Sequence, residues 1–297
     1  MKTAFYARLS TERENPRSAS LDRLSALQIV RLMNREDRRT LRAIARAEAD
    51  LACAAERIVR SLSVGGSLFF VGAGTSGRLG VIEAAECPPT FNVPARRVRA
   101  LMAGGRKAVF RSQEGSEDSL AEGRRAVRKW VRRGDVVLGI AASGVTPFVR
   151  AALRQARRQK ASVLLLTCSP APGLKKEADI LIVLDTGPEV LTGSTRLKAG
   201  TACKMALNIL TTASMAQLGK MYGHWMVDLQ PKSRKLVARG LRIIQDLGRV
   251  SEKRARRLFA RSHGEVKTAI VMARRKYSYT QATRRLSQAN GFLRRAL

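Results

Sequence analysis

Five short apolar segments recur between residues 67 and 185, each separated from the next by a stretch long enough for a helix. They are apolar throughout instead of alternating with polar residues, which is typical of strands buried on both faces of a sheet. We therefore predict an α/β fold with a parallel sheet flanked by helices. The segments are SLFFVG (67–72), VRALMAG (98–104), DVVLGIA (135–141), SVLLLTC (162–168) and DILIVLD (179–185).

Helical periodicity dominates both ends of the chain. Apolar residues recur at helical spacing over 22–62, and a wide apolar stripe over 197–218 predicts a buried helix. After QPKSRK (230–235) no further strand is predicted, and four helices are expected, near 236–247, 251–262, 264–275 and 279–288. We therefore expect two domains: residues 1–235 with the sheet and the N-terminal helices, and residues 236–297 as a small all-helical domain.

Three turns rich in glycine and hydroxyl residues stand where strands feed helices: GAGTSG (72–77), AASGVTP (141–147) and TGSTRLKAGT (192–201). The carboxyl ends of parallel strands meet at one edge of a sheet, where such proteins bind ligands. Backbone N–H groups and hydroxyls at helix starts bind phosphate. We therefore predict a phosphosugar site formed by Gly74, Thr75, Ser76, Ser143, Gly144, Thr146, Ser194 and Thr195.

The first of these turns also satisfies the dinucleotide-binding pattern G-x-G-x-x-G. Such sites usually hold the ribose with an acidic residue about 20 positions further on. The next strand instead ends in Gly104-Gly105, without a carboxylate. An NADP site tolerates that difference, so a nicotinamide-dependent oxidoreductase stays open as an alternative.

Two pairs of glutamates lie beside the predicted phosphate site in sequence. Glu83 and Glu86 are three residues apart on the helix after the first turn, just before Cys-Pro-Pro, and Glu114 and Glu117 share that spacing. Residues at this spacing share a helix face. Like charges in a semi-enclosed pocket raise a carboxyl pKa toward the range useful in acid–base catalysis. These pairs are therefore candidates for acid–base chemistry.

The chain is strongly basic, with 56 Lys and Arg against 23 Asp and Glu and a formal net charge of +33. Such a charge attracts polyanions through counterion release. The cations are spread over predicted helix faces, aromatic residues make up only 5%, and no nucleic-acid-binding motif is present. We expect salt-sensitive, sequence-independent binding and no specific nucleic-acid partner.

The N-terminal sequence MKTAFYARLSTERENP lacks the apolar stretch of a secretory signal, and no apolar run reaches the length of a membrane span. We expect a cytoplasmic protein without membrane association. The four cysteines are widely spaced and include no C-x-x-C pair. Neither a metal site nor a disulfide framework is predicted.

Long and particular stretches of the chain match one known family: TERENPRSASLDRLSALQIVRLMNRED (11–37), GAGTSGRLGVIEAAECPPTF (72–91), EGSEDS (114–119), GIAASGVTP (139–147) and GPEVLTGSTRLKAGTACKMALNIL (187–210). With these, the sequence closely resembles N-acetylmuramic acid 6-phosphate etherases, which belong to the sugar isomerase (SIS) group. The resemblance continues through EVKTAIVMARR (265–275) to the C-terminus. It implies an SIS-type sheet and a homodimer that closes its sites between subunits.

The resemblance also implies an activity, namely removal of D-lactate from N-acetylmuramic acid 6-phosphate during peptidoglycan recycling, without metal, nucleotide or other cofactor. In the implied route the sugar ring opens, a base takes the C2 proton, lactate leaves C3 and water adds to the unsaturated intermediate. Glu86 and Glu117 match the family's acid–base pair. Lys267 matches a lysine that the related glucokinase regulatory protein places over its ligand's phosphate.

A second reading of the same resemblance is a non-catalytic phosphosugar sensor like that regulatory protein, which has two SIS units and is about twice as long. A single unit with both glutamates favours the enzyme. The chain departs from the family at Val145, where Arg is usual, at Glu83, where Asp is more frequent, and over KSRKL (232–236). None of these departures affects the implied catalytic pair.

Overall fold

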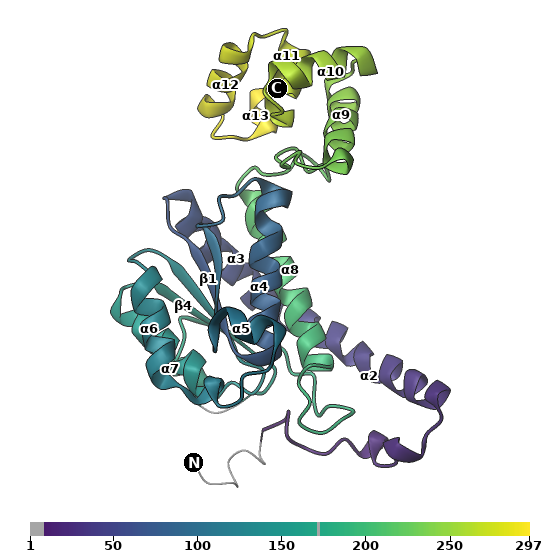
Figure 1. Cartoon of the computed structure of the whole chain (residues 1–297), viewed down its shortest axis with the longest axis vertical. Helices are drawn as coiled ribbons and strands as arrows, with labels where there is room; N and C mark the ends of the chain where they lie inside the picture. The colour runs from purple at the N-terminus through teal and green to yellow at the C-terminus, as the bar shows by residue number, and fades with distance from the viewer. Residues whose placement is uncertain (1–8, 171–172) are drawn as a thin grey trace. The chain divides into compact units, whose positions relative to one another are not determined.

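Five parallel strands form the sheet, in the order β2-β1-β3-β4-β5 (Figure 1). The computed structural model describes residues 9–170 and 173–297. Each strand lies inside one of the predicted apolar segments, so the parallel α/β fold is confirmed. The strands are β1 (Leu68–Gly72), β2 (Val98–Met102), β3 (Val136–Ile140), β4 (Ser162–Thr167) and β5 (Ile180–Val183).

Helices cover both faces of this sheet (Figure 1). On one face lie α6 (Leu120–Trp130) and α7 (Pro147–Arg158). The other face carries α3 (Glu48–Ser63) and parts of α4 (Gly74–Phe91) and α8 (Lys198–Gln217). The central strands β1 and β3 are buried along their whole length, which explains why their sequences are apolar at every position.

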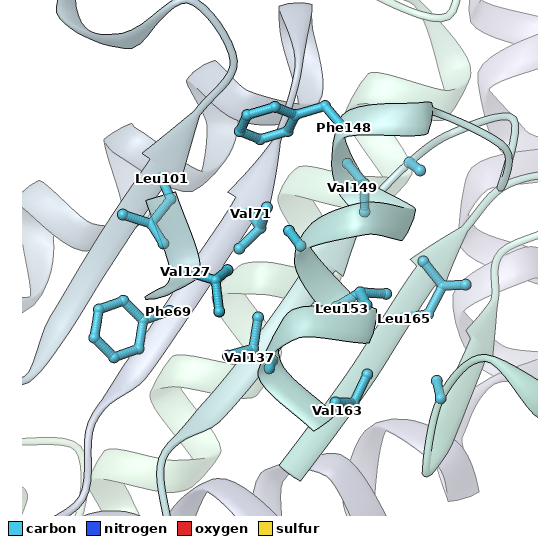
Figure 2. Close-up of a cluster of buried hydrophobic side chains, with 14 of the residues drawn as sticks. Phe69, Val71, Leu101, Val127, Val137, Phe148, Val149, Leu153, Val163 and Leu165 are labelled. Carbon is cyan, nitrogen blue, oxygen red and sulfur yellow. The ribbon is translucent and has the colours of Figure 1, made fainter. Parts of the chain in front are cut away.

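The apolar core between α7 and the sheet depends on aliphatic side chains of the helix and on a glycine in β3. Figure 2 shows Leu153 of α7 close to Val137 of β3 and Val163 of β4, with Val149 on the same helix nearer to Phe148. Gly139 of β3 permits this approach, because a Cβ there would lie 2.7 Å from Val149 Cγ1. Burial of each such aliphatic side chain contributes about 1.5–3 kcal/mol.

The predicted N-terminal helical region consists of short turns η1 (Pro16–Ser18) and η2 (Leu21–Arg23), followed by α2 (Ala26–Arg46) and α3. Ser25 and Gln28 form a capping box that starts α2. Buried Glu36 of α2 pairs with buried Lys198 at 2.7 Å, while Asn15 and Arg17 donate to the same carboxylate. This network links residues 15–36 to the start of α8.

The chain divides into two compact units, one with residues up to 85 and 96–211, the other with 86–95 and 212–297. The second unit contains the four predicted C-terminal helices, α9 (Arg234–Gly248), α10 (Glu252–Arg261), α11 (Val266–Arg275) and α12 (Tyr279–Gln288), and a short α13 (Leu293–Ala296) that the sequence did not predict. This division differs from the expected boundary at 235, because Val227 and Leu229 belong to the same apolar cluster as the C-terminal helices.

Short elements connect the sheet and its helices: α5 (Gly105–Phe110), η3 (Ser116–Asp118) and η4 (Leu174–Lys176). Over the described part of the chain, none of the helices has the length and apolar character needed to cross a membrane. The four cysteines are free thiols, of which only Cys53 is exposed. The Sγ atoms of Cys168 and Cys203 lie 3.8 Å apart in the interior.

Candidate active site

The strand order reverses between β1 and β3, and parallel sheets bind ligands in the crevice at such a point. A cavity of about 280 Å³ lies there. The turn after β1, the turn after β3 and the turn before α8 all contribute to it, as the sequence predicted. Its lining residues are Glu12, Ala73, Gly74, Thr75, Ser76, Glu117, Asp118, Ala142, Ser143, Val145, Thr146, Pro147, Gly193 and Thr195.

The turn after β1 is built from glycines that let helix and strand approach closely. A Cβ at Gly72 would lie 2.7 Å from the nitrogen of Gly77, and a Cβ at Gly77 would lie 2.8 Å from the oxygen of Gly72. Gly74 has a positive φ of 52° and begins α4. Thr75 and Ser76 therefore stand at the first turn of the helix, half-buried, with the cavity beside them.

The turn after β3 places Ser143 and Thr146 at the cavity and α7 immediately behind, beginning with Pro147. Gly144 is buried and has a φ of 78°, and a Cβ there would lie 2.6 Å from Leu174 Cδ1. Gly144 thus shapes the turn but does not line the cavity itself. Val145, at the family's usual Arg position, is a buried lining residue.

The start of α8 differs from the sequence-based expectation. Thr195 lines the cavity, but Ser194 does not. The N–H groups of Lys198 and Ala199 donate to the buried carboxylate of Glu189 at 3.1 and 2.9 Å. Burial raises the pKa of Glu189, and these two N–H bonds oppose that rise. Glu189 therefore accepts hydrogen bonds from the first N–H groups of α8. From the sequence alone, we expected the N–H groups at this helix start to bind phosphate.

Within residues 9–170 and 173–297, no lysine or arginine lines the cavity. The cavity instead offers hydroxyls and the N-terminal ends of α4 and α7, whose peptide dipoles favour negative charge. This arrangement suits a terminal phosphate, whose three oxygens accept several hydrogen bonds at once.

Glu117 is the predicted catalytic residue that lies in the cavity. It belongs to η3, and its side chain is partly in solvent. Removal of part of its hydration raises its pKa, and the charges of Asp118 and Glu114 raise it further. The sequence anticipated the repulsion from Glu114. A carboxyl group of this kind retains its proton to higher pH than an ordinary glutamate.

The two glutamates of the other pair, Glu83 and Glu86, lie in different environments. Glu83 is buried, with its Oε2 2.9 Å from Lys204 Nζ and its Oε1 2.5 Å from Thr211 Oγ1. Its charge is therefore neutralised within the fold instead of acting on Glu86. Glu86 is exposed and does not line the cavity. It follows Gly74 by twelve residues of α4, which corresponds to about 18 Å of helix rise.

Lys267 lies within the second compact unit. Its ammonium contacts Asp228 Oδ2 at 2.9 Å, the carbonyl of Gly219 at 3.0 Å and the carbonyl of Gly291 at 2.9 Å. Burial lowers its pKa, and Asp228 opposes that change. All three protons of the ammonium therefore have acceptors inside this unit.

Family models and curated relatives agree on the kind of protein. Residues 50–157 match the glucokinase regulatory protein N-terminal SIS domain, and residues 118–213 match the SIS domain. The chain is 49% identical over 290 residues to the N-acetylmuramic acid 6-phosphate etherase of Gloeothece citriformis, covering 97% of this chain and 95% of the relative. This chain belongs to the N-acetylmuramic acid 6-phosphate etherase family. The relative of the same name from Geobacillus thermodenitrificans is 44% identical, with 97% and 98% covered.

A solved structure shares the SIS fold at low sequence identity. The phosphoheptose isomerase from Francisella tularensis superposes with a TM-score of 0.50 at 17% identity, covering 64% of this chain and all of the isomerase. At this identity the likeness concerns the fold alone, and it agrees with the parallel sheet.

Sequence reasoning missed three features of this etherase-family site. Glu12 and Asp118 add carboxylates to the cavity; both lie in stretches that match the family (11–37 and 114–119), but the sequence analysis assigned neither of them a role. Arg78 donates from Nε to the carbonyl of Val109 at 2.9 Å and from a terminal nitrogen to that of Ala108 at 2.8 Å. It thereby ties α4 to α5, the element that precedes Glu117. Over the described residues no group of three or more His, Cys, Asp or Glu side chains is placed to hold a metal ion.

Proposed function

We propose that this chain is a carbon–oxygen lyase that cleaves the D-lactyl ether of N-acetylmuramic acid 6-phosphate, giving N-acetylglucosamine 6-phosphate and D-lactate. Curated relatives of 44–49% identity over 97% of the chain carry the name of this etherase, which supports the proposal. The observation that carries it is the cavity at the strand-order reversal, where a hydroxyl-lined phosphate cradle adjoins Glu117, a carboxyl of raised pKa.

In this proposal the 6-phosphate binds between the N-terminal ends of α4 and α7. Thr75, Ser76, Ser143, Thr146 and Thr195 donate hydroxyl hydrogen bonds, with backbone N–H groups of the two helix starts. Gly74 and Gly144 allow the turns to adopt their positive φ angles. The reacting carbons of the open-chain sugar then extend from the phosphate toward Glu117.

The chemistry consists of proton transfers around carbons 2 and 3. The C1 aldehyde of the open-chain sugar acidifies the proton on C2, which a carboxylate removes. The C3–O bond then breaks, and lactate leaves with a proton from a carboxylic acid. Water adds to the resulting double bond, with its hydroxyl on C3 and a proton on C2, so no oxidant, metal or nucleotide is consumed. The raised pKa of Glu117 suits it to hold and deliver such a proton.

We assign Glu86 as the second member of the acid–base pair, acting in the cavity of a second copy of the chain. Its distance along α4 from the phosphate cradle separates it from the cradle of its own chain. A mixture of two inactive variants tests this assignment. Co-refolded Glu86→Gln and Glu117→Gln chains should recover activity, because one of the two sites in a mixed dimer contains both native glutamates. Absence of recovery in mixed dimers would place both glutamates on one chain.

A homodimer is therefore part of the proposal, as the family resemblance implies. One side of α8 is covered within the chain itself, with Ala206, Leu207 and Leu210 fully buried, whereas Ile209 and Ala216 are exposed. Further exposed aliphatic side chains lie on α2, at Leu27, Val30 and Leu41. A surface of this kind favours association with a second copy.

Binding of the substrate phosphate by Lys267 also stays a proposal, and it requires the ammonium to leave Asp228. Lys267→Ala would then raise the KM for the sugar phosphate. If Lys267 serves only to stabilise its own unit, the variant lowers the melting temperature and leaves KM unchanged.

We place the reaction in the cytoplasm, in the recycling of cell-wall sugars, as the resemblance to the etherase family implies. A non-catalytic sensor is the alternative, and one assay separates the two. The etherase, incubated with N-acetylmuramic acid 6-phosphate, releases D-lactate and N-acetylglucosamine 6-phosphate in equal amounts. A sensor binds the sugar phosphate and releases no lactate. The Glu117→Gln variant controls for contaminating activity.

A further inference from the structure

Glu12 brings a third carboxylate to the cavity from a part of the chain far from Glu117 and Asp118 in sequence. The segment that carries it is held at the carboxyl-terminal end of β4. Leu9 and Thr11 are buried, and the N–H of Ser10 donates to Ser169 Oγ at 3.1 Å, just beyond β4. Glu12 is therefore held in place by its neighbours, although its own side chain is exposed.

The glycine at position 193 leaves room for this carboxylate. A Cβ at Gly193 would lie 3.2 Å from Glu12 Oε2, and Gly193 has a φ of 77°. The other oxygen, Oε1, accepts a hydrogen bond from Thr11 Oγ1 at 3.2 Å. The carboxylate thus stands beside the turn that carries Thr195, within the lining of the cavity.

Across residues 9–170 and 173–297 Glu12 forms no ion pair, whereas Glu36, Glu83 and Glu177 each form at least one. A carboxylate in this position would repel a phosphate, so phosphate binding alone does not account for it. It is, however, a strong acceptor for hydroxyl and amide protons.

We propose that Glu12 binds the sugar part of the substrate, accepting a hydrogen bond from a hydroxyl or from the acetamido N–H. This role rests on the proposed function, because it takes the ligand to be an amino-sugar phosphate. The cavity then combines two recognition chemistries, with hydroxyls and helix starts for the phosphate and a carboxylate for the polar groups of the sugar.

Calorimetric titration with two ligands tests this proposal: N-acetylglucosamine 6-phosphate, and inorganic phosphate, which lacks the sugar. Glu12→Gln should weaken binding of N-acetylglucosamine 6-phosphate by about 10-fold or more, the effect of losing a hydrogen bond to a charged group. The same variant should bind inorganic phosphate as tightly as the wild type or more tightly, because a repelling charge is gone. Glu14→Gln is the matched control, since Glu14 is exposed on the same segment and does not line the cavity. It should leave both affinities unchanged.

Equal or tighter binding of both ligands by Glu12→Gln, or equal weakening of both, would overturn the proposal. Glu12→Ala is the second variant, with a melting curve to show that the chain is folded, and it should reproduce the split between the two ligands. Lactate release by the wild type tests the proposed function separately. A wild type that releases lactate, combined with a Glu12→Gln variant of unchanged sugar-phosphate affinity, rejects only the role of Glu12. If the Glu12 variants bind the sugar phosphate more weakly but not inorganic phosphate, and the wild type releases no lactate, only the etherase reaction is rejected.

Discussion

Among single residues, Glu117 determines the predicted dependence of the rate on pH. Replacement of a general acid or base typically costs about 10²- to 10⁴-fold in rate. We therefore expect Glu117→Gln to lower kcat by that order while sugar-phosphate binding persists.

The charge of Asp118 helps to raise the pKa of Glu117, so Asp118→Asn should lower that pKa and move the corresponding limb of the pH–kcat profile to lower pH. An unchanged limb in Asp118→Asn would show that another group titrates there.

Glu36 links stability to pH. Burial alone would raise its pKa, but hydrogen bonds from Lys198, Arg17 and Asn15 outweigh burial and lower the pKa to about 2. A carboxyl whose pKa falls on folding stabilises the protein above its unfolded pKa, and this contribution is lost as pH falls toward the folded value. A shift of this size corresponds to about 3 kcal/mol.

Glu36→Gln should therefore lower the free energy of unfolding by roughly 3 kcal/mol at pH 7, because buried Lys198 loses its charged partner. The difference from the wild type should shrink between about pH 4.5 and pH 2, where the native carboxylate takes up a proton. Urea denaturation at several pH values measures both. A difference that is constant over this range would contradict the linkage.

At the scale of secondary-structure elements, Arg78 of α4 couples this helix to the segment that carries Glu117. Its guanidinium satisfies the carbonyls of Ala108 and Val109 at the C-terminal end of α5, where no intrahelical donor is available. We expect Arg78→Ala to cost about 2 kcal/mol of stability and to lower kcat more than it changes KM. Arg78→Lys should recover part of kcat. Arg106→Ala, which removes an exposed cation from α5, is the control and should behave as the wild type.

Strands and helices could be predicted because their signals are local. The continuous apolar runs located all five strands, and the helical periods located α8 to α12. The hydrogen-bond and ion-pair partners of particular polar side chains could not be predicted, because they depend on contacts between segments far apart in the sequence. Glu189 takes the N–H groups at the start of α8, Lys204 neutralises Glu83, and Glu12 reaches the cavity from the N-terminal segment. Nothing local in the sequence marks these pairings.

At the scale of the whole molecule, the exposed aliphatic face of α2 leads us to expect a dimer in solution. Leu27→Asp combined with Val30→Asp should convert it to a monomer in light scattering at micromolar concentration, because buried charges would oppose association. Leu41→Asp alone tests whether the interface extends along α2. A wild type of monomeric mass would contradict the proposed dimer and, with it, the placement of Glu86 in a partner's cavity.

The net charge of +33 is a property of the surface as a whole. Among the residues that the structure describes, no lysine or arginine lines the cavity, so their charge is not concentrated on the site. Sequence-independent binding to nucleic acid, weakening steeply as salt rises, stays a prediction.

The measurement that tests the central claim most directly is the reaction of N-acetylmuramic acid 6-phosphate with the wild-type protein in D₂O. Elimination through C2 removes the proton from that carbon, and the proton that C2 regains when water adds comes from solvent. We predict release of D-lactate together with N-acetylglucosamine 6-phosphate that carries deuterium at C2, as detected by mass spectrometry and NMR. Lactate release with the original hydrogen retained at C2 would exclude this mechanism, and absence of lactate would contradict the proposed function itself.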